Sequence, residues 1–361
     1  MFITLLKHKT EVITKEFKHL LQTGFPNQTT TTYKRFTFET DHIPKQATHI
    51  EQCKQLLTRL IASHPEITTM TKEDIAKCYT KSLIPKKTGG YRTINAPNEN
   101  LKNIHRSIVS TLQEMQILEH DSAYAYIKNR GIYNALQAHQ NNQSKWFLKI
   151  DLKNFFGSCS EKFIYQQLTQ VYPFAVLTSD PEYDTIIKDL IKIACLDGVL
   201  PQGNPISPYL TNLIMVPIDY KLNKLCPVYT RYSDDMLFSA RTKIDLDKTV
   251  KNITKVLKNT PLKINQEKTR LGSINGNNWN LGLMLNKDNN ITLGHEKKRQ
   301  FKATIDQFLY NPDKYSISEK QKLAGIIAYY LHIEGPYIRY IIDKYNKRHN
   351  KNLLELLHHP L

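Results

Sequence analysis

The sequence predicts an α+β protein, in which helices and antiparallel strands occur without a regular strand–helix–strand alternation. Helical apolar periodicity marks residues 1–70 and the segment from about residue 290. Between them, an apolar run at 146–151 ends in a carboxylate, and a second apolar stretch at 228–239 is interrupted only by Ser233-Asp234. With 40% apolar residues in 361, the chain can bury a sizeable core.

The first elements are helical and are followed by a hairpin. An amphipathic start leads into a threonine-rich loop at 29–32, and Leu56, Leu57 and Leu60 then follow a helical spacing. The segment 71–74 is typical of a capping box and predicts a short helix through Tyr79. The pair Gly89-Gly90 suits a tight turn between two strands over 84–94.

The later elements alternate between helix and strand. Residues 101–145 are predicted to be mainly helical, 146–151 a buried strand, and 228–239 two strands folded at Ser233-Asp234. The helix after Pro208 should kink or end at Pro217. In the basic C-terminal part, Ser316 and Glu319 predict another capping box, and the helix that follows should end at 335–336.

The charge balance favours a polyanionic partner. Lys and Arg number 50 against 33 Asp and Glu, a net charge of +17, and nucleic acid is the usual partner of such an excess. No apolar run approaches the ~18 residues of a membrane-spanning helix, and no signal peptide is recognisable, so we expect a cytoplasmic protein without a membrane partner. The five cysteines stand alone, which is typical of buried apolar residues in a reducing compartment.

Three acidic residues form the candidate catalytic centre. Asp234 and Asp235 lie in the tetrapeptide Tyr-Ser-Asp-Asp, and Asp151 ends the strand upstream. Two Mg²⁺ ions can activate a nucleophile and stabilise a leaving group in nucleotidyl transfer, and Mg²⁺ prefers few carboxylates with phosphates and water. Asp-Asp by itself is more often a solvated turn. Here its flanks are apolar, and a charged pair among buried strands is costly without a cation.

Three segments resemble the central palm motifs of reverse transcriptases, in the order of that family: 147–156, 200–208 (Leu-Pro-Gln-Gly-Asn-Pro-Ile-Ser-Pro) and 232–235. The resemblance covers roughly residues 80–290. It implies a right-hand polymerase fold with fingers, an antiparallel palm sheet and a helical thumb. The implied domains are a mainly helical N-terminal extension at 1–70, fingers and palm at 71–289, and a basic helical thumb at 290–361.

The resemblance also implies roles for individual residues, each of which has a plainer structural interpretation. Asp151, Asp234 and Asp235 would hold two Mg²⁺ ions, and Lys268 would protonate the leaving pyrophosphate. Phe156, otherwise a core aromatic, would exclude a ribose 2′-hydroxyl. The resemblance assigns dNTP binding to Lys86, Lys87, Arg92, Gln202 and Gly203; the plainer interpretation is a solvated hairpin for the basic residues and an ordinary turn for the other two. It assigns the primer grip to Leu281, Gly282 and Leu283, which would otherwise form a simple strand.

Among bacterial reverse transcriptases, the chain is similar to the retron and defence-associated types. Residues 134–139 resemble a retron Asn-Ala-x-x-His element with one residue too many, and Ser233 replaces the usual Ala. We therefore favour a defence-type enzyme, with a true retron enzyme as the close alternative. Untemplated or protein-primed synthesis, an RNA-dependent RNA polymerase and an inactive nucleic-acid-binding scaffold are further alternatives. The implied partners are a structured non-coding RNA as template and primer, dNTPs, the DNA product, and a protein effector or a second copy of the chain.

Overall fold

The computed structural model describes residues 43–85, 89–276 and 282–358. Its helices are α2 (Ile43–Ser63), α3 (Glu66–Thr69), α4 (Lys72–Lys77), α5 (Glu99–Glu114), α6 (Ile132–Asn141), α7 (Phe155–Ser158), α8 (Glu161–Leu168), α9 (Phe174–Leu177), α10 (Pro181–Ala194), α11 (Ile206–Leu222), α12 (Leu246–Leu257), α13 (Gly294–Tyr310), α14 (Ile317–His349) and α15 (Leu353–His358), with 3₁₀ turns η2 (Gln266–Lys268) and η3 (Pro312–Lys314). The strands are β1 (Tyr79–Pro85), β2 (Tyr91–Pro97), β3 (Trp146–Asp151), β4 (Val228–Tyr232), β5 (Asp235–Ala240), β6 (Arg270–Ser273), β7 (Met284–Leu285) and β8 (Ile291–Thr292). Antiparallel sheets between separate helices confirm the predicted α+β class.

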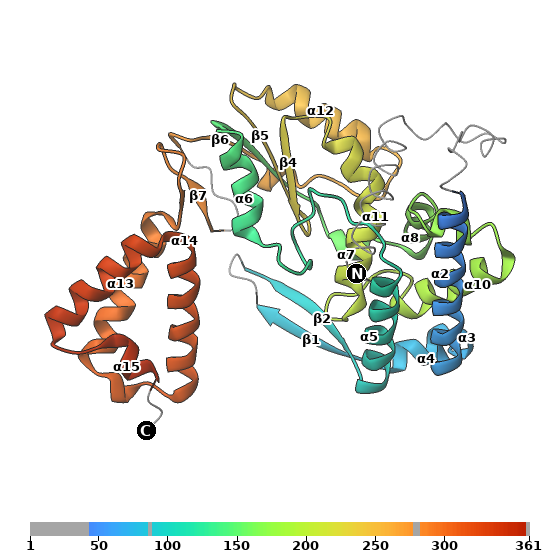
Figure 1. The fold of residues 1–361 in the computed structure, drawn as a ribbon, viewed down its shortest axis with the longest axis horizontal. Helices are drawn as coiled ribbons and strands as arrows, with labels where there is room; N and C mark the ends of the chain where they lie inside the picture. Colours follow the sequence, from blue (N-terminus) through green and yellow to red (C-terminus); the bar gives the residue numbers. More distant parts are fainter. Residues whose placement is uncertain (1–42, 86–88, 277–281, 359–361) are drawn as a thin grey trace.

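The central sheet has four antiparallel strands in the order β4-β5-β3-β6. The strand predicted at 146–151 is β3, and the two strands predicted at 228–239 are β4 and β5. Strand β3 pairs with β5 from Trp146 opposite Ala240 to Asp151 opposite Asp235. This register places the end of β3 beside the turn between β4 and β5 (Figure 1).

Helix α11 passes through the main core. Its predicted apolar face, which includes Leu210 and Leu213, is buried, and so are most of its other residues. It contacts α5, α8 and α12. Of the expected kink or end at Pro217, the end is wrong, because α11 continues to Leu222. Proline removes one backbone hydrogen bond from a helix, and burial on all sides of α11 offsets that loss.

The N-terminal described elements join the same core. Helix α2 contacts α5 and α10, and its Cys53, Leu57 and Leu60 are buried in the main cluster. The capping box at Thr71 is confirmed, with the Thr71 and Asp74 side chains each bonding the other residue's backbone. The helix ends at Lys77 rather than Tyr79, which begins β1.

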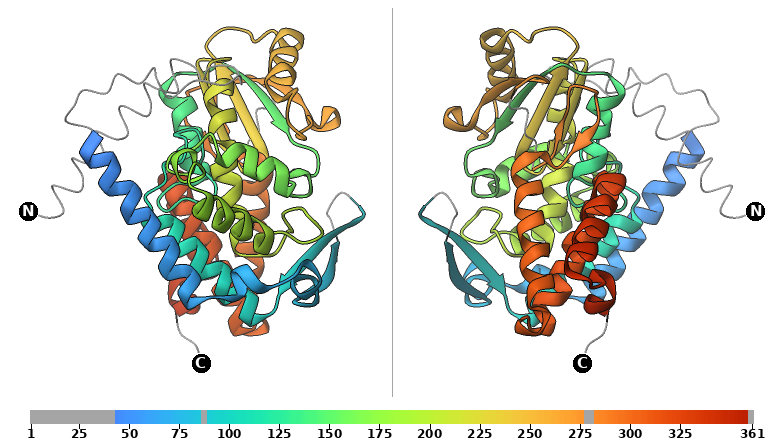
Figure 2. Two further views of the ribbon diagram at one scale, coloured as in Figure 1. Left: turned by 90° about the vertical axis from the view of Figure 1, so that its right-hand side faces the viewer. Right: turned by 90° about the vertical axis from the view of Figure 1, so that its left-hand side faces the viewer.

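The predicted hairpin is confirmed as the antiparallel pair β1 and β2, which projects from the body as a two-stranded arm (Figure 2). Gly89 and Gly90, with φ of 87° and 76°, adopt the left-handed backbone that glycine permits. Strand β1 is exposed along almost its whole length, and β2 is mostly exposed or half-buried. A lone two-stranded hairpin is marginally stable in water. The arm therefore depends on the contacts at its base.

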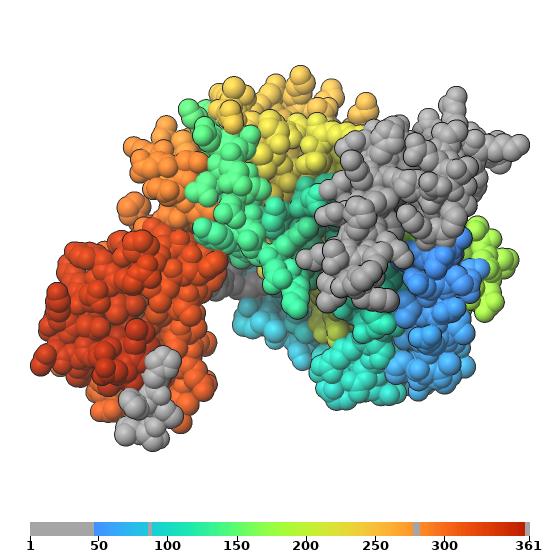
Figure 3. All heavy atoms as spheres, in the orientation of Figure 1, coloured from blue at the N-terminus to red at the C-terminus, as the bar shows by residue number. Residues whose placement is uncertain are grey.

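The C-terminal helices α13, α14 and α15 pack in a second core around Phe301, Ile305, Phe308 and Leu309, which also takes in Leu136 of α6, Phe147 of β3 and Leu237 of β5. Figure 3 shows them as a lobe beside the sheet, with the surface indented between this lobe and the segment that carries β1, β2 and α5. The capping box at Ser316 is confirmed.

The helix expected to end at Gly335-Pro336 bends there instead. Glu334 leaves helical geometry at φ −136° and ψ 54°, and the helix resumes and runs to His349. The Glu334 carboxylate accepts hydrogen bonds from the Leu293 backbone N–H (2.9 Å) and the Lys298 ammonium (2.6 Å), which ties the bend to the start of α13. These contacts hold the bend in place, at the point where the proline interrupts the helical hydrogen bonds.

None of the helices in the described ranges is long and apolar enough to cross a membrane. The five cysteines are free thiols, and Cys53, Cys159 and Cys195 are fully buried. Burial raises the pKa of Cys53 and Cys159 to about 12, which leaves them as thiols at neutral pH. Their position in the core agrees with the interpretation of these residues as small apolar side chains.

Candidate active site

The three predicted carboxylates lie together at one end of the central sheet. Asp151 is the last residue of β3 and faces Asp235, the first residue of β5, across the strand pair. Asp234 lies in the turn between β4 and β5, which we call the acidic turn (Tyr232–Asp235). The backbone N–H of Leu152 donates to the Asp234 carbonyl at 3.2 Å, so the end of β3 is bonded directly to this turn.

The turn itself requires an unusual backbone conformation. Ser233 has φ of 59°, in the left-handed region that residues with a side chain rarely occupy. Its hydroxyl accepts a hydrogen bond of 3.2 Å from the Tyr126 hydroxyl, and its carbonyl accepts one of 3.2 Å from the Arg231 guanidinium. These contacts hold a conformation that the local sequence alone does not favour.

The carboxylates differ in their surroundings. Asp151 accepts hydrogen bonds from the Lys268 ammonium (3.0 Å) and the Asn265 side-chain amide (3.1 Å). Asp235 forms an ion pair with Lys149 at 2.9 Å. Burial, together with the negative charges of Asp235 and Asp151, raises the pKa of Asp234. The accumulated negative charge makes this end of the sheet attractive to a cation.

Carboxylate oxygens, the donors gathered here, are the type of ligand that Mg²⁺ prefers. Within residues 43–85, 89–276 and 282–358, no group of three His, Cys, Asp or Glu side chains forms a ready-made metal cage. Mg²⁺ in nucleotidyl transfer uses one or two carboxylates together with phosphate and water oxygens, and does not need an all-protein cage. The clustered carboxylates and the raised pKa of Asp234 are what such a site would offer.

Lys268 is brought into the site from a distant part of the sequence. It ends the 3₁₀ turn η2, which the Asn265 backbone N–H ties to the Asp151 carbonyl at 2.8 Å. The Lys268 side chain is 62% exposed, while its ammonium lies on the 8% exposed Asp151 carboxylate. An ammonium on a largely exposed side chain, next to a predicted metal ligand, has the reach and the charge for proton donation.

Phe156 lies on the short helix α7, directly after the end of β3. The side chain is half-buried against the main core, and its ring centroid is 5.6 Å from that of the buried Phe155 in an edge-on arrangement. Neighbouring Asn154 has φ of 45°, a left-handed bend that turns the chain between Asp151 and this helix. The half-buried ring fits both the gate role and a packing role.

Gln202 and Gly203 join the body to the projecting arm. The Gln202 carbonyl accepts a 2.8 Å hydrogen bond from the Asn95 backbone N–H in β2. Gly203 has φ of 115°, and a Cβ there would lie 2.7 Å from Ile94 Cγ2 and 2.8 Å from the Asn95 carbonyl oxygen. The close approach that this glycine permits is therefore made to β2.

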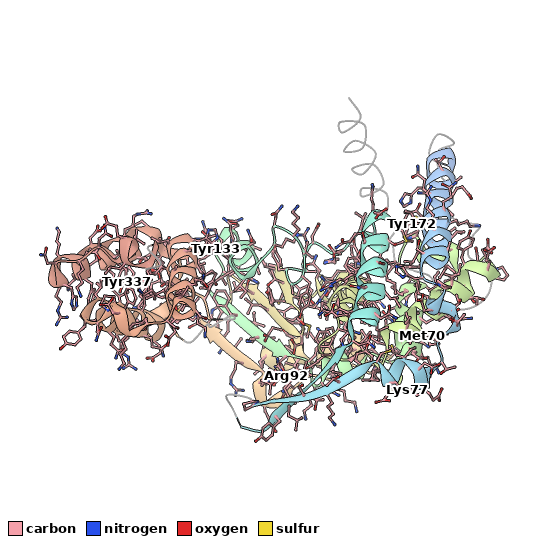
Figure 4. The ribbon with its side chains drawn as sticks, turned by 90° about the horizontal axis from the view of Figure 1, so that it is seen from below. Met70, Lys77, Arg92, Tyr133, Tyr172 and Tyr337 are labelled. Atoms are coloured by element: carbon pink, nitrogen blue, oxygen red, sulfur yellow. The ribbon has the colours of Figure 1, made fainter. Side chains whose placement is uncertain are left out.

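The structure describes only some of the residues predicted for the fingers and for the primer grip. Arg92 is exposed on β2, on the underside of the molecule seen in Figure 4. Lys86, Lys87 and Leu281 lie outside the described residues. Leu283 is fully buried in the C-terminal core, and Gly282, with φ of 87°, contacts the Lys297 side chain so closely that a Cβ would collide with its ammonium.

Sequence reasoning did not single out Arg231, Asp219, Lys149 or Asn265. Arg231 lies in an apolar strand and Asp219 in an apolar helix, and each position indicates a buried ion pair, since a buried charge requires a partner. The sequence does not say which partner. His139, which ends the retron-like element, bridges the hydroxyls of Thr230 on β4 (2.8 Å) and Ser239 on β5. Burial lowers the pKa of His139 to about 3, so it is neutral.

Comparison with known proteins agrees with this geometry. Residues 84–306 match the family described as reverse transcriptase (RNA-dependent DNA polymerase). The chain is 29% identical to the retron Ec83 reverse transcriptase of Escherichia coli over 82% of this chain and 96% of that protein. It is 31% identical to the retron Ec73 reverse transcriptase of Escherichia coli over 73% and 85%, respectively.

Among solved structures, a telomerase from Candida albicans in complex with a fragment of telomeric RNA superimposes with a TM-score of 0.44 and 12% identity, covering 84% of this chain and 59% of that one. The family match extends from the β1–β2 arm through the carboxylates into α13. The chain belongs to the reverse transcriptase family and is an RNA-directed DNA polymerase of the bacterial retron type.

Proposed function

We propose that this reverse transcriptase copies a structured non-coding RNA by adding dNTPs to a primer 3′-hydroxyl, with two Mg²⁺ ions held by Asp151, Asp234 and Asp235. The observation that carries the proposal is that these three residues converge at one end of the β3–β5 pair. Asp151 and Asp234 are 83 positions apart in the sequence. The ions would supply the charge that activates the hydroxyl and stabilises the leaving pyrophosphate.

The chain's own residues would orient the reactants. The Asp234 carboxylate, half-buried beside two other carboxylates, is best neutralised by a cation that arrives with the nucleotide. Lys268, whose ammonium lies on Asp151, would donate a proton to the leaving pyrophosphate. Proton donation of this kind contributes ~10²–10⁴-fold to a rate.

The nucleotide would lie between the arm and the sheet. Arg92, together with Lys86 and Lys87, would grip the triphosphate, since Arg offers a bidentate fork and Lys a point charge. Gln202 and Gly203 would support the template–nucleotide pair, and their bonding to β2 would set the spacing between arm and sheet. Leu281, Gly282 and Leu283 would hold the primer strand.

The biological role that we propose is defence against phage, with the template RNA serving also as primer. The similar proteins are retron reverse transcriptases, which favours the RNA-linked product of a retron over untemplated or protein-primed synthesis. A protein effector or a second copy of the chain would complete the system.

The test is to purify the protein with its bound nucleic acid and to sequence both RNA and DNA. A short defined RNA with complementary DNA is expected. Asp234→Ala combined with Asp235→Ala should abolish Mg²⁺-dependent primer extension and phage protection, a loss of at least about 10³-fold since charge-stabilising groups contribute most of such rates. Asp247→Ala combined with Asp288→Ala, which removes two exposed carboxylates outside the site, is the matched control.

Synthesis that persists in the Asp234 and Asp235 variant would overturn the proposed metal site. DNA without a complementary RNA would point to untemplated synthesis instead. Loss of extension with full phage protection would separate the polymerase from the defence role.

A further inference from the structure

Arg231 is fully buried, three residues before Asp234 in the sequence, and it is the largest of the fully buried side chains in the described ranges. It lies on β4, and its partner Asp219, also fully buried, lies on α11. Neither residue is exposed to substrate. Their role must therefore be sought in what they hold in place.

The arginine joins three parts of the molecule. Its Nε and Nη2 donate to the two Asp219 carboxylate oxygens at 3.0 and 2.8 Å, the two-pronged geometry that guanidinium allows. Its Nη1 donates to the side-chain oxygen of Asn212 and to the backbone carbonyl of Ser233, both at 3.2 Å. The hydroxyl of Tyr229 donates to Asp219 at 2.7 Å.

The backbone of Arg231 is clamped as well. Its N–H donates to the Ser122 carbonyl at 2.6 Å, and its carbonyl accepts from the Tyr124 N–H at 2.9 Å. In the same loop, residues 122–126, the Tyr126 hydroxyl donates a hydrogen bond to the Ser233 hydroxyl. The Ala125 carbonyl of this loop accepts a hydrogen bond of 2.8 Å from the Asn212 side chain. The acidic turn is therefore held by α11 on one side and by the loop at 122–126 on the other, and Arg231 forms hydrogen bonds with both.

A buried ion pair is rarely the most stable solution for a core, because apolar residues of similar size often serve as well or better. What apolar residues cannot do is donate a hydrogen bond to the Ser233 carbonyl. That carbonyl belongs to the peptide group that precedes Asp234, and Ser233 has a strained φ of 59°. Fixing this peptide group fixes the direction in which the Asp234 side chain leaves the turn.

We propose that the buried Arg231–Asp219 pair is a positioning device for the acidic turn, which sets the turnover rate of DNA synthesis without contacting substrate. The inference rests on the proposed catalytic role of Asp234. Catalytic groups must be held within about 0.5 Å of their working positions, and a misplacement of about 1 Å can cost ~10²-fold in rate.

Two variants separate positioning from stability. In Arg231→Lys, an ammonium can still pair with Asp219, so the protein should fold. A single point charge cannot also reach the Ser233 carbonyl. The double variant Arg231→Met with Asp219→Leu removes both charges together, which avoids leaving one buried and unpaired. Leu190→Ala, a core truncation in α10, is a control for lost stability.

The assay is primer extension on a template–primer duplex, with melting temperature measured beside it. For both Arg231 variants we expect kcat to fall about 10- to 100-fold, with KM for dNTP and Kd for the duplex changed less than about threefold. The Mg²⁺ concentration for half-maximal rate should rise. Leu190→Ala should lower the melting temperature but leave kcat unchanged at the assay temperature.

Wild-type kcat in Arg231→Lys would overturn the proposal, and this variant decides alone if the double variant does not fold. A fall in kcat that Leu190→Ala reproduces at equal loss of stability would also overturn it. Activity that persists in the Asp234→Ala, Asp235→Ala protein would instead contradict the proposed metal site, so the two failures are distinguishable.

Discussion

At the residue scale, the three carboxylates of the site are equivalent in charge but not in environment. Asp151 and Asp235 each have a lysine within 3.0 Å. Asp234 is the one whose pKa is raised, by burial first and then by the two neighbouring carboxylates. The acidic turn therefore stores unfavourable electrostatic energy, which a bound cation would relieve.

This difference predicts opposite stability effects for two conservative substitutions. The folded-state pKa of Asp234 lies above its unfolded value, so the stability that this carboxyl contributes is present at low pH and falls as pH rises above about 4. Asp234→Asn should therefore raise the melting temperature by about 2 °C at pH 7.5 while abolishing synthesis. The increase should vanish at pH values well below about 4, where the Asp234 carboxyl is protonated in both the folded and the unfolded protein.

Asp235→Asn is the matched control for this measurement, since it removes the partner of Lys149 and should lower the melting temperature or leave it unchanged. Thermal melts without divalent metal, recorded across pH, provide the check. An Asp234→Asn protein that melts below the wild type at neutral pH would contradict the electrostatic interpretation.

Phe156 provides a second residue-scale prediction. If its half-buried ring excludes a 2′-hydroxyl, Phe156→Ala should raise incorporation of ribonucleotides relative to deoxyribonucleotides by about 10- to 100-fold, the effect of a lost steric contact in a pocket. The measurement is the ratio of kcat/KM for dNTP and rNTP. Phe155→Leu, in the fully buried neighbour, should leave that ratio unchanged. Equal discrimination in Phe156→Ala and the wild type would leave Phe156 a packing residue.

At the element scale, the arm β1–β2 is positioned by one loop of the body. The Gln202 carbonyl bonds to Asn95 of β2, and Gly203 lies against Ile94 and the Asn95 carbonyl without room for a side chain. The arm has little buried surface of its own. Its angle to the sheet therefore depends on this contact.

Gly203→Ala should lower the free energy of unfolding by about 2–3 kcal/mol, since it adds a collision to the strain of a positive φ. Gly90→Ala is the matched control, because Gly90 also has a positive φ but nothing lies within 4 Å of its missing Cβ. It should cost about 1 kcal/mol. Urea unfolding curves of the two variants provide the check, and equal losses would mean that the contact with β2 is not tight.

At the scale of the whole molecule, the net charge of +17 and the indented surface between the C-terminal helices and the arm fit a duplex of nucleic acid. Many of the basic side chains are already paired with carboxylates, Lys298 with Glu334 among them. In the C-terminal lobe, Lys298 and Lys302 also lie near the ring of Tyr337, labelled in Figure 4. The net charge of +17 already subtracts these carboxylates, so pairing reduces the number of free basic side chains and not the net charge available to phosphates.

Binding of a template–primer duplex should weaken steeply with salt, by ~10³–10⁵-fold between 50 and 200 mM if 6–10 phosphates are contacted. Lys302→Ala, in α13, should reduce the slope of log Kd against log salt by about 1. Lys77→Ala, an exposed lysine on α4, is the control and should leave the slope unchanged. Fluorescence anisotropy across salt concentrations measures both, and a flat salt dependence would contradict the electrostatic model.

Local sequence determined most of the secondary structure of this protein. The strand 146–151, the two strands around Ser233, the arm and both capping boxes follow from alternation, turn residues and side-chain caps, which act over a few positions. The motifs in those elements were enough to identify the family. The proposed domain boundaries and the individual site roles remain predictions.

Only the tertiary structure decided how distant charges are paired. Arg231 with Asp219, Lys268 with Asp151 and Lys149 with Asp235 depend on strand register and on the path of α11, and long-range register is not encoded in local periodicity. The same holds where α11 continues past Pro217 and where Glu334 bends α14, since packing against neighbouring elements overrides what proline favours locally.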